Sequence, residues 1–304
     1  MGTAAFALPF PLSALGGRGA PADSGSDDIP PRADHARLAA WSATLRAEKP
    51  SRARGARTPI GREAAHVGEL AIGTPYEAFT LEAYLRAGGE PSAAEPLTLS
   101  LTRFDCVTLV ESCLAIARIA AGERAPTWKR FAGEMERMRY RQGVRRGYTS
   151  RLHYFSEWIS DGAQRGLVRE IASELGGVRD ERPLRFMSEH RGSYPALAND
   201  DVYRQIGEME RRLDSSPRFF IPAQRIPDVS DRIQTGDVLA FATSIPGLDV
   251  SHAAFAYRDG KGILRVLHAP LSGGAVEITR ATLPKYVANI RRATGILLAR
   301  PLRG

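Results

Sequence analysis

The spacing of apolar residues changes along the chain. Up to about residue 215, apolar positions recur every three or four residues, which is typical of amphipathic helices. From residue 237, short apolar runs bounded by Gly, Pro or Asp predict an antiparallel sheet. Helices followed by strands indicate an α+β fold. The expected helices are 35–49, 61–72, 104–121, 127–140, 153–165, 167–175 and 199–213, and the expected strands are 237–243, 253–257, 262–268, 275–279 and 295–300.

The first 33 residues differ in composition from the rest. Residues 3–15 are apolar, and residues 16–34 are rich in Gly, Pro, Ser and Asp. This order resembles the core of a signal peptide, although no Lys or Arg precedes Arg18. We therefore interpret residues 1–33 as a signal-like or disordered leader. A single domain is expected over 34–304, helical in 34–215 and a β-sheet in 233–301. A signal implies the periplasm or cell envelope, whereas a disordered tail is compatible with the cytoplasm.

Composition excludes several classes of protein. The chain has 304 residues, of which 43% are hydrophobic, so it can bury a core and is not disordered overall. It has no run of 18 apolar residues, so no membrane span is expected. Two cysteines cannot build a disulfide framework or a Cys-rich zinc site. The net charge is +8, and 38 of the 42 basic residues are Arg, which fits either an anionic partner or an Arg-rich solvated surface.

Cys106 lies near the start of the strongest predicted helix. Thr102 to Asp105 has the Ser/Thr-x-x-Asp form that opens helices, which makes Thr102 the expected N-cap and places Cys106 in the first turn or just beyond it. Free backbone N–H groups and the helix dipole lower the pKa of a thiol there and favour a nucleophile. The alternative is a buried structural cysteine, which fits Cys113 in the middle of the helix.

A cysteine nucleophile needs a base and a group that orients the base. His252 and His268 lie at the ends of two adjacent predicted strands. A two-residue loop at Asp259-Gly260, which turn propensity favours, pairs 258 with 261 and puts His252 opposite Leu267. A loop one residue longer pairs 258 with 262 and puts His252 opposite His268. A catalytic pair requires this second register or a β-bulge. Taken singly, each histidine is also compatible with a structural role.

These residues resemble a known family of enzymes. Gly73-Thr74-Pro75-Tyr76, Phe104-Asp105-Cys106, Ser251-His252 and His268 together resemble the NlpC-type papain-like cell-wall hydrolases. The resemblance is closer to the N-acetylmuramoyl-L-alanine amidase-like branch and extends from about residue 61 to residue 301. The segments that carry it are 101–111, 138–141, 150–155, 236–237 and 247–252.

The resemblance implies a papain-like core, in which the nucleophile helix packs on an antiparallel sheet, with a helical insertion between them. It implies hydrolysis of the amide between (anhydro-)N-acetylmuramic acid and L-Ala, with Cys106 as nucleophile, His252 as base and His268 orienting His252. No metal or cofactor is expected. A stem-peptide endopeptidase or an acyltransferase would use the same thioester. Pro270 departs from the family, whose members usually have Ser at that position.

The expected partners are peptidoglycan fragments, and the oligomeric state is left open. The resemblance indicates Tyr76, Asp105 and Ser251 as substrate-binding residues. The basic and aromatic segment 137–158 adds Arg151 and Tyr154, because Arg pairs with stem-peptide carboxylates and aromatic rings cover sugar faces. The same arginines are compatible with a nucleic-acid-binding protein, but that function leaves Cys106 and the histidines unexplained, so nucleic acid is not expected.

Overall fold

The computed structural model describes residues 31–47, 58–270 and 274–304. The predicted leader lies almost wholly outside these residues, and the first described helix begins at Arg32. The helices are α1 (Arg32–Ala47), α2 (Ile60–Leu70), α3 (Ala83–Arg86), α4 (Cys106–Ala121), α5 (Trp128–Arg139), α6 (Phe155–Gln164), α7 (Phe186–Glu189), α8 (Asp200–Asp214), α9 (Ile226–Val229) and α10 (Leu283–Ala288). Within the described ranges, no helix is long and apolar enough to cross a membrane.

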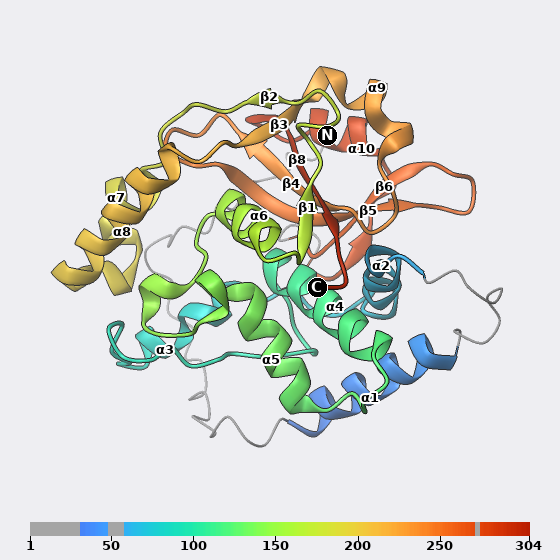
Figure 1. Ribbon diagram of the computed structural model, residues 1–304, viewed down its shortest axis with the longest axis horizontal. Coiled ribbons are helices and arrows are strands. Elements are labelled where there is room, and N and C mark those ends of the chain that lie inside the picture. Colours follow the sequence, from blue (N-terminus) through green and yellow to red (C-terminus); the bar gives the residue numbers. More distant parts are fainter. Residues whose placement is uncertain (1–30, 48–57, 271–273) are drawn as a thin grey trace.

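The strands form one antiparallel sheet, which confirms the predicted α+β class. They are β1 (Val168–Glu170), β2 (Val178–Arg179), β3 (Phe219–Pro222), β4 (Val238–Thr243), β5 (Val250–Arg258), β6 (Leu264–His268), β7 (Glu277–Ile278) and β8 (Ala293–Pro301). Their order in space is β2-β3-β8-β4-β5-β6-β7, and β1 also pairs with β8. Helices α2, α4 and α6 lie along one side of the sheet and α9 and α10 along the other (Figure 1).

Both faces of the sheet are buried, and the alternation of side chains along β4 shows why. Val238, Ala240 and Ala242 belong to the core beneath α4, whereas Leu239 and Phe241 belong to a second core with residues of α9 and α10. Successive side chains of a strand point to opposite faces, so a continuous apolar run fills both cores. The sheet is therefore a central layer between two sets of helices.

The prediction of a helix over 167–175 was wrong. Residues 168–170 form β1, which pairs with Ala299 to Pro301 of β8. Strands β2 and β3 were also missed, and both extend the sheet on the β8 side. Two- to four-residue strands have almost no periodicity of their own, and their partners lie far along the chain. The sheet therefore includes strands from the part of the chain expected to be helical.

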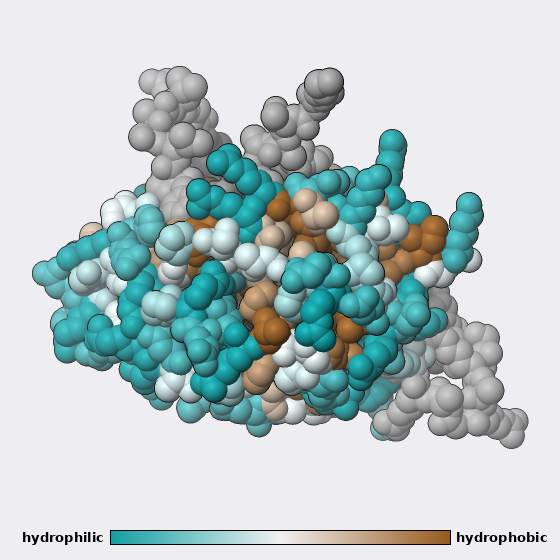
Figure 2. Space-filling view, turned by 90° about the horizontal axis from the view of Figure 1, so that it is seen from above, coloured by the Kyte–Doolittle hydropathy of each residue, from teal (hydrophilic) through white to brown (hydrophobic). Residues whose placement is uncertain are grey.

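The surface is mainly hydrophilic, as one face of the molecule shows (Figure 2). Hydrophobic residues reach this face in small, separate patches. Across the described residues, the large hydrophobic side chains that are exposed are Ile72, Val144, Val178 and Leu302. They come from different parts of the chain, as scattered surface hydrophobics normally do.

Gly236 gives a direct test of the packing between α2 and the sheet. It has a φ of +88°, and a Cβ atom there would overlap the carbonyl group of Gly61 at the start of α2. We expect Gly236→Ala to lower the free energy of unfolding by about 3 kcal/mol, because backbone strain and steric overlap add. Urea unfolding checks this. Gly260→Ala is the control, since a Cβ atom at Gly260 meets nothing within 4 Å. Equal stability of the two variants would contradict this account of the packing.

Candidate active site

Helix α4 begins at Cys106, and a capping box fixes this start. Asp105 Oδ1 accepts a hydrogen bond from the Thr108 backbone N–H at 2.7 Å, and the Asp105 N–H donates to Thr108 Oγ1 at 2.9 Å. The N-cap is therefore Asp105, and the prediction of Thr102 was wrong. An Asp-x-x-Thr sequence satisfies the first orphan N–H groups equally well. Cys106 is the first helical residue, so its own N–H has no partner inside the helix.

The turn Gly73 to Tyr76 lies directly beside this helix start. Tyr76 forms a parallel bridge with Phe104, and the Phe104 N–H donates to the Pro75 carbonyl at 3.0 Å. Arg37 of α1 donates to Thr74 Oγ1 at 2.9 Å and to the Leu101 carbonyl at 2.7 Å. One side chain of the first described helix thus holds together the two segments that flank Cys106.

The β5–β6 hairpin has neither of the two registers considered from the sequence. Arg258 pairs with Leu264, so five residues separate the strands. Asp259 explains the longer loop, because its Oδ1 accepts from the N–H groups of Lys261 and Ile263 at 2.9 and 3.0 Å. A carboxylate that bonds the backbone ahead of it favours such a loop over a two-residue turn.

His252 and His268 nevertheless meet. Continuing the register places His268 opposite Ala254, two residues from His252 along β5. A shift by two residues keeps both side chains on one face of the sheet, where diagonal neighbours are within reach of long side chains. His252 Nε2 lies 2.8 Å from His268 Nδ1. The His252 ring also stacks on Phe241, so the pair lies on the sheet face opposite the body of α4.

The surroundings of the Cys106 side chain favour a neutral thiol. Burial, and secondly the Asp105 carboxylate, raise the pKa of Cys106 to about 12. The backbone N–H groups of Ala253, Val107 and Cys106 itself lower it, but they do not outweigh burial. The prediction that the helix start gives Cys106 a lowered pKa is therefore wrong, because burial outweighs the effect of the backbone N–H groups. The effect of Ala253 also places the Cys106 thiol next to the residue that follows His252.

The surroundings of His252 favour a neutral side chain as well. Burial, and secondly the neighbouring His268, hold the pKa of His252 well below its usual value. Burial raises the pKa of Tyr76, and the negative charges that Cys106 and Asp105 can carry add to this. Burial also raises the pKa of Tyr286, with contributions from Glu277 and Cys106. The two tyrosines thus lie close enough to feel the charge of a Cys106 thiolate.

The predicted binding residues fall into two groups. Tyr76 and Asp105 lie beside Cys106, and Ser251 precedes His252 on β5. The Ser251 hydroxyl oxygen is buried and has no hydrogen-bond partner among the described residues. Arg151 and Tyr154 instead lie in the interior, at 5% and 2% exposure. Arg151 pairs with Glu82 and Glu95, and the Tyr154 hydroxyl donates to Glu210 at 2.6 Å.

The arginines of segment 137–158 mostly pair inside the protein. Arg139 lies 2.8 Å from Glu111 in the interior, with both side chains at 2% exposure or less. The other ion pairs of this segment are Arg137–Glu134, Arg141–Glu157, Arg145–Glu136 and Arg151 with Glu82 and Glu95. Five of its six arginines therefore already have a carboxylate partner, which leaves Arg146 as the remaining one. Most of this basic segment stabilises the fold.

Two residues of the site were missed in the sequence. Glu277 lies opposite His268 in the β6–β7 pairing, with 3.7 Å between its Oε1 and His268 Nε2. Tyr286 of α10 has its hydroxyl 3.4 Å from His268 Nδ1. Both lie on short elements near the end of the chain, and neither belongs to a motif. Alternation within the expected strand 275–279 could have placed Glu277 at a strand position, but not its partner.

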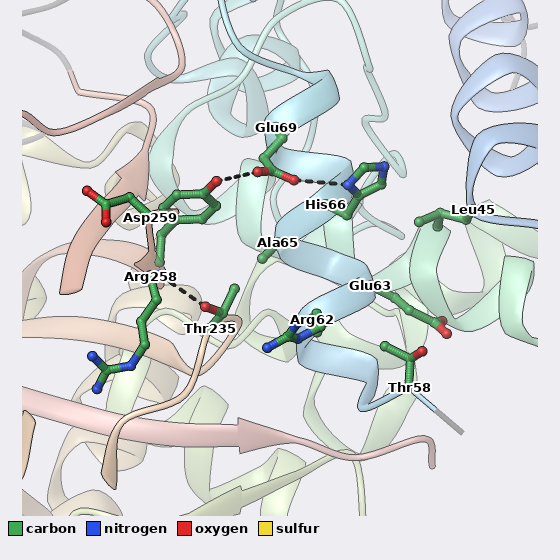
Figure 3. A pocket seen from close by; sticks show the side chains of 11 residues that line it. Leu45, Thr58, Arg62, Glu63, Ala65, His66, Glu69, Thr235, Arg258 and Asp259 are labelled. Atoms are coloured by element: carbon green, nitrogen blue, oxygen red, sulfur yellow. Dashed lines mark hydrogen bonds and ion pairs between the residues drawn. The ribbon is translucent and has the colours of Figure 1, made fainter. Parts of the chain in front are cut away.

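A pocket lies elsewhere on the molecule. A pocket of about 380 Å³ opens between α2 and the residues around Tyr257, with Arg62, Glu69 and Arg258 in its lining (Figure 3). Its polar groups contact one another: Tyr257 donates to Glu69, which lies 2.9 Å from His66 Nδ1. None of the residues around Cys106 lines this pocket. In the described part of the chain, no group of three His, Cys, Asp or Glu side chains could hold a metal ion.

Comparison with protein families shows the class to which this fold and site belong. Residues 66–296 match the family model of N-acetylmuramoyl-L-alanine amidase-like proteins. The chain belongs to this family, as its sequence motifs predicted. A search of curated proteins finds no match.

Solved structures agree with this assignment. A crystal structure of an N-acetylmuramoyl-L-alanine amidase from Bacteroides uniformis is 28% identical with a TM-score of 0.72, covering 80% of this chain and 99% of that one. A Bacteroides fragilis protein named as a candidate xylanase is 32% identical with a TM-score of 0.69, covering 77% and 98%. A Legionella pneumophila protein, 18% identical with a TM-score of 0.63 over 88% and 94%, shares the fold.

Asp105 links the helix start to the acidity of Cys106. Asp105→Asn keeps a side-chain oxygen that can cap α4 but removes the charge that raises the pKa of Cys106. We expect the variant to react faster with iodoacetamide at neutral pH, with its pH profile of alkylation shifted to lower pH. Asp105→Ala separates the two effects, because it also loses the cap, at a cost of about 1 kcal/mol of stability. An unchanged alkylation profile in Asp105→Asn would show that the charge does not act on Cys106.

Proposed function

We propose that this protein is a cysteine amidase of the papain-like NlpC type that cleaves peptidoglycan fragments. The favoured bond is the amide between the lactyl group of N-acetylmuramic or anhydro-N-acetylmuramic acid and L-Ala. The observation that carries the proposal is that the thiol of Cys106, the first residue of α4, lies next to Ala253, which follows His252 on β5, while His252 is hydrogen-bonded to His268. The family and the Bacteroides uniformis amidase support the substrate class.

Attack begins from a neutral thiol and a neutral imidazole. The Cys106 proton moves to His252 Nδ1 as Sγ bonds to the carbonyl carbon of the substrate. His252 Nε2 is engaged with His268, which leaves Nδ1 as the nitrogen available for this transfer. The oxygen of the tetrahedral intermediate becomes negative, and the N–H of Cys106, which has no partner inside α4, is suited to stabilise it. Tyr76 is positioned to contact the same region.

Collapse of the intermediate releases the amine. His252 returns the proton to the nitrogen of L-Ala, the C–N bond breaks, and a thioester remains on Cys106. Water, deprotonated by His252, then attacks the thioester carbonyl and frees the lactyl carboxylic acid, and the proton returns to the thiol. His268 keeps the His252 ring in one orientation through both steps, as the third member of a triad does.

Other reactions on the same site differ only in the acyl group or in the acceptor. An endopeptidase would form the thioester within the stem peptide, and an acyltransferase would use an amine in place of water. A glycoside hydrolase needs two carboxyl groups beside the scissile bond, whereas Asp105, the carboxylate next to Cys106, is engaged in capping α4. The substrate class implies action in the periplasm or cell envelope.

Substitution of the triad tests the function. We expect Cys106→Ala to abolish release of the stem peptide from a defined anhydromuropeptide, because no other group can form the acyl-enzyme. His252→Ala should lower kcat by about 10²–10⁴-fold, as loss of a general base does. His268→Ala removes only an orienting group and should cost less, up to about 10²-fold. Mass spectrometry of the products measures the loss and shows which bond breaks.

The controls for this experiment address the alternatives. Cys113→Ala should retain activity, because Cys113 is buried in the middle of α4. Iodoacetamide should inactivate the enzyme and EDTA should not. Product release by Cys106→Ala would refute the mechanism, and cleavage within the stem peptide would favour the endopeptidase.

The depressed pKa of His252 predicts the pH dependence. His252 acts as a base only when unprotonated, and its pKa lies well below its usual value. We therefore expect the acid limb of kcat/KM to lie below about 6.5, the ordinary pKa of histidine. Initial rates at low substrate concentration over the acidic range check this. A midpoint at or above that value would contradict the proposed neutral resting pair.

A further inference from the structure

The far nitrogen of His268 faces a carboxylate. His268 is fully buried, and its Nε2 has no hydrogen-bond partner within 3.5 Å in the described part of the chain. Glu277 Oε1 lies 3.7 Å from this nitrogen. The two residues are direct partners in the β6–β7 pairing, so the strands hold them side by side. The Glu277 side chain is 52% exposed and can rotate to shorten this distance.

The hydrogen bonds of the histidine pair determine which nitrogen of His268 carries a proton. If His252 accepts the thiol proton on Nδ1, its own proton lies on Nε2 and is donated to His268 Nδ1. His268 Nδ1 is then an acceptor, so the proton of His268 lies on Nε2, facing Glu277. The other neighbour of Nδ1 is the Tyr286 hydroxyl at 3.4 Å, farther away than His252.

We propose that Glu277 is a positioning residue that extends the triad to a line of four groups, Cys106, His252, His268 and Glu277. The inference rests on the proposed function of this site. Glu277 accepts the Nε2 proton of His268 and fixes its tautomer. Its negative charge makes His268 Nδ1 a stronger acceptor, which stabilises the positive charge that His252 acquires when it takes the thiol proton.

The charges around the pair agree with this role. The ionisable groups facing His268 are His252 on β5, Glu277 on β7 and Tyr286 on α10. The contact with His268, and secondly the charge of Arg280, hold the pKa of Glu277 below its usual value, so this side chain is a carboxylate at neutral pH. Burial keeps the Tyr286 hydroxyl protonated. Glu277 is thus the negatively charged group that faces Nε2 of His268.

Substitution of Glu277 by Ala and by Gln separates orientation from charge. Ala removes both the acceptor and the charge, whereas Gln keeps an acceptor without the charge. We expect kcat for muropeptide cleavage to fall about 10-fold in Glu277→Ala and less in Glu277→Gln, with KM unchanged. The acid limb of kcat/KM should move to lower pH in both, because a protonated His252 loses the support of a negative charge. Glu174→Ala is the matched control, since Glu174 is 49% exposed and pairs at 3.6 Å with Arg169 of β1, a strand that pairs with β8 and not with β6 or β7.

Two readouts need no substrate and so separate this proposal from the proposed function. The rate of Cys106 alkylation by iodoacetamide at neutral pH should fall in both Glu277 variants, with Cys106→Ala as the blank. The ¹⁵N shifts of the His268 ring, assigned with His268→Ala, should show an Nε2 proton in the parent and loss of this single tautomer in Glu277→Ala. Unchanged alkylation and an unchanged tautomer would overturn the role of Glu277. A changed alkylation rate and a changed His268 tautomer, together with no cleavage of muropeptides, would support the positioning role of Glu277 and refute the proposed substrate.

Discussion

The hydrogen bonds between Asp105 and Thr108 are the constraint on which the site depends. They end the extended segment at Asp105 and start α4 at the next residue, so the backbone N–H of Cys106 has no partner inside the helix. A start one residue earlier or later would turn the thiol by about 100° around the helix axis. The bridge between Tyr76 and Phe104 and the bonds from Arg37 fix the approach to this point. The first described helix thus acts on the site without touching the thiol.

The sequence predicted most of the helices and the central strands, because their patterns are long and regular. It predicted Cys106 and the histidines from motif, and the structure brings His252 and His268 together. The register of the β5–β6 hairpin could not be predicted from the sequence, because the hydrogen bonds of Asp259 decide the loop length. The histidines meet all the same, since a shift of two residues preserves the face on which a side chain points. Strands β1 to β3 could not be predicted, because their partner β3 or β8 lies tens of residues away along the chain.

The Arg-rich composition was a weaker guide, and the interior of the molecule explains why. A segment with six arginines and several aromatic residues suggests a surface for anionic ligands, but Glu82, Glu95 and Glu111 come from elsewhere in the chain to meet them, and Glu157 pairs with Arg141 within the segment itself. Burial raises the pKa of Glu95 and Glu111, and the neighbouring guanidinium groups oppose that rise. Removing one partner of such a pair leaves an uncompensated buried charge, which is costly. A basic segment in a sequence therefore indicates an anionic ligand only if its arginines do not form ion pairs within the protein.

Burial also determines the protonation of the residues in the candidate active site. Burial alone keeps a thiol protonated and an imidazole neutral. Accordingly, the pKa of Cys106 is raised and the pKa of His252 is lowered. In the proposed mechanism, proton transfer between them creates two charges in a poorly solvated region, which is favourable only if fixed groups receive each charge as it forms. The backbone N–H groups at the start of α4 and at Ala253 face the sulfur. On the other side, the polar groups lie in sequence along adjacent strands, from His252 on β5 to His268 on β6 and Glu277 on β7. In the proposed mechanism the antiparallel sheet therefore does more than support α4, because the order of β5, β6 and β7 sets the order of the groups that would share the positive charge of His252.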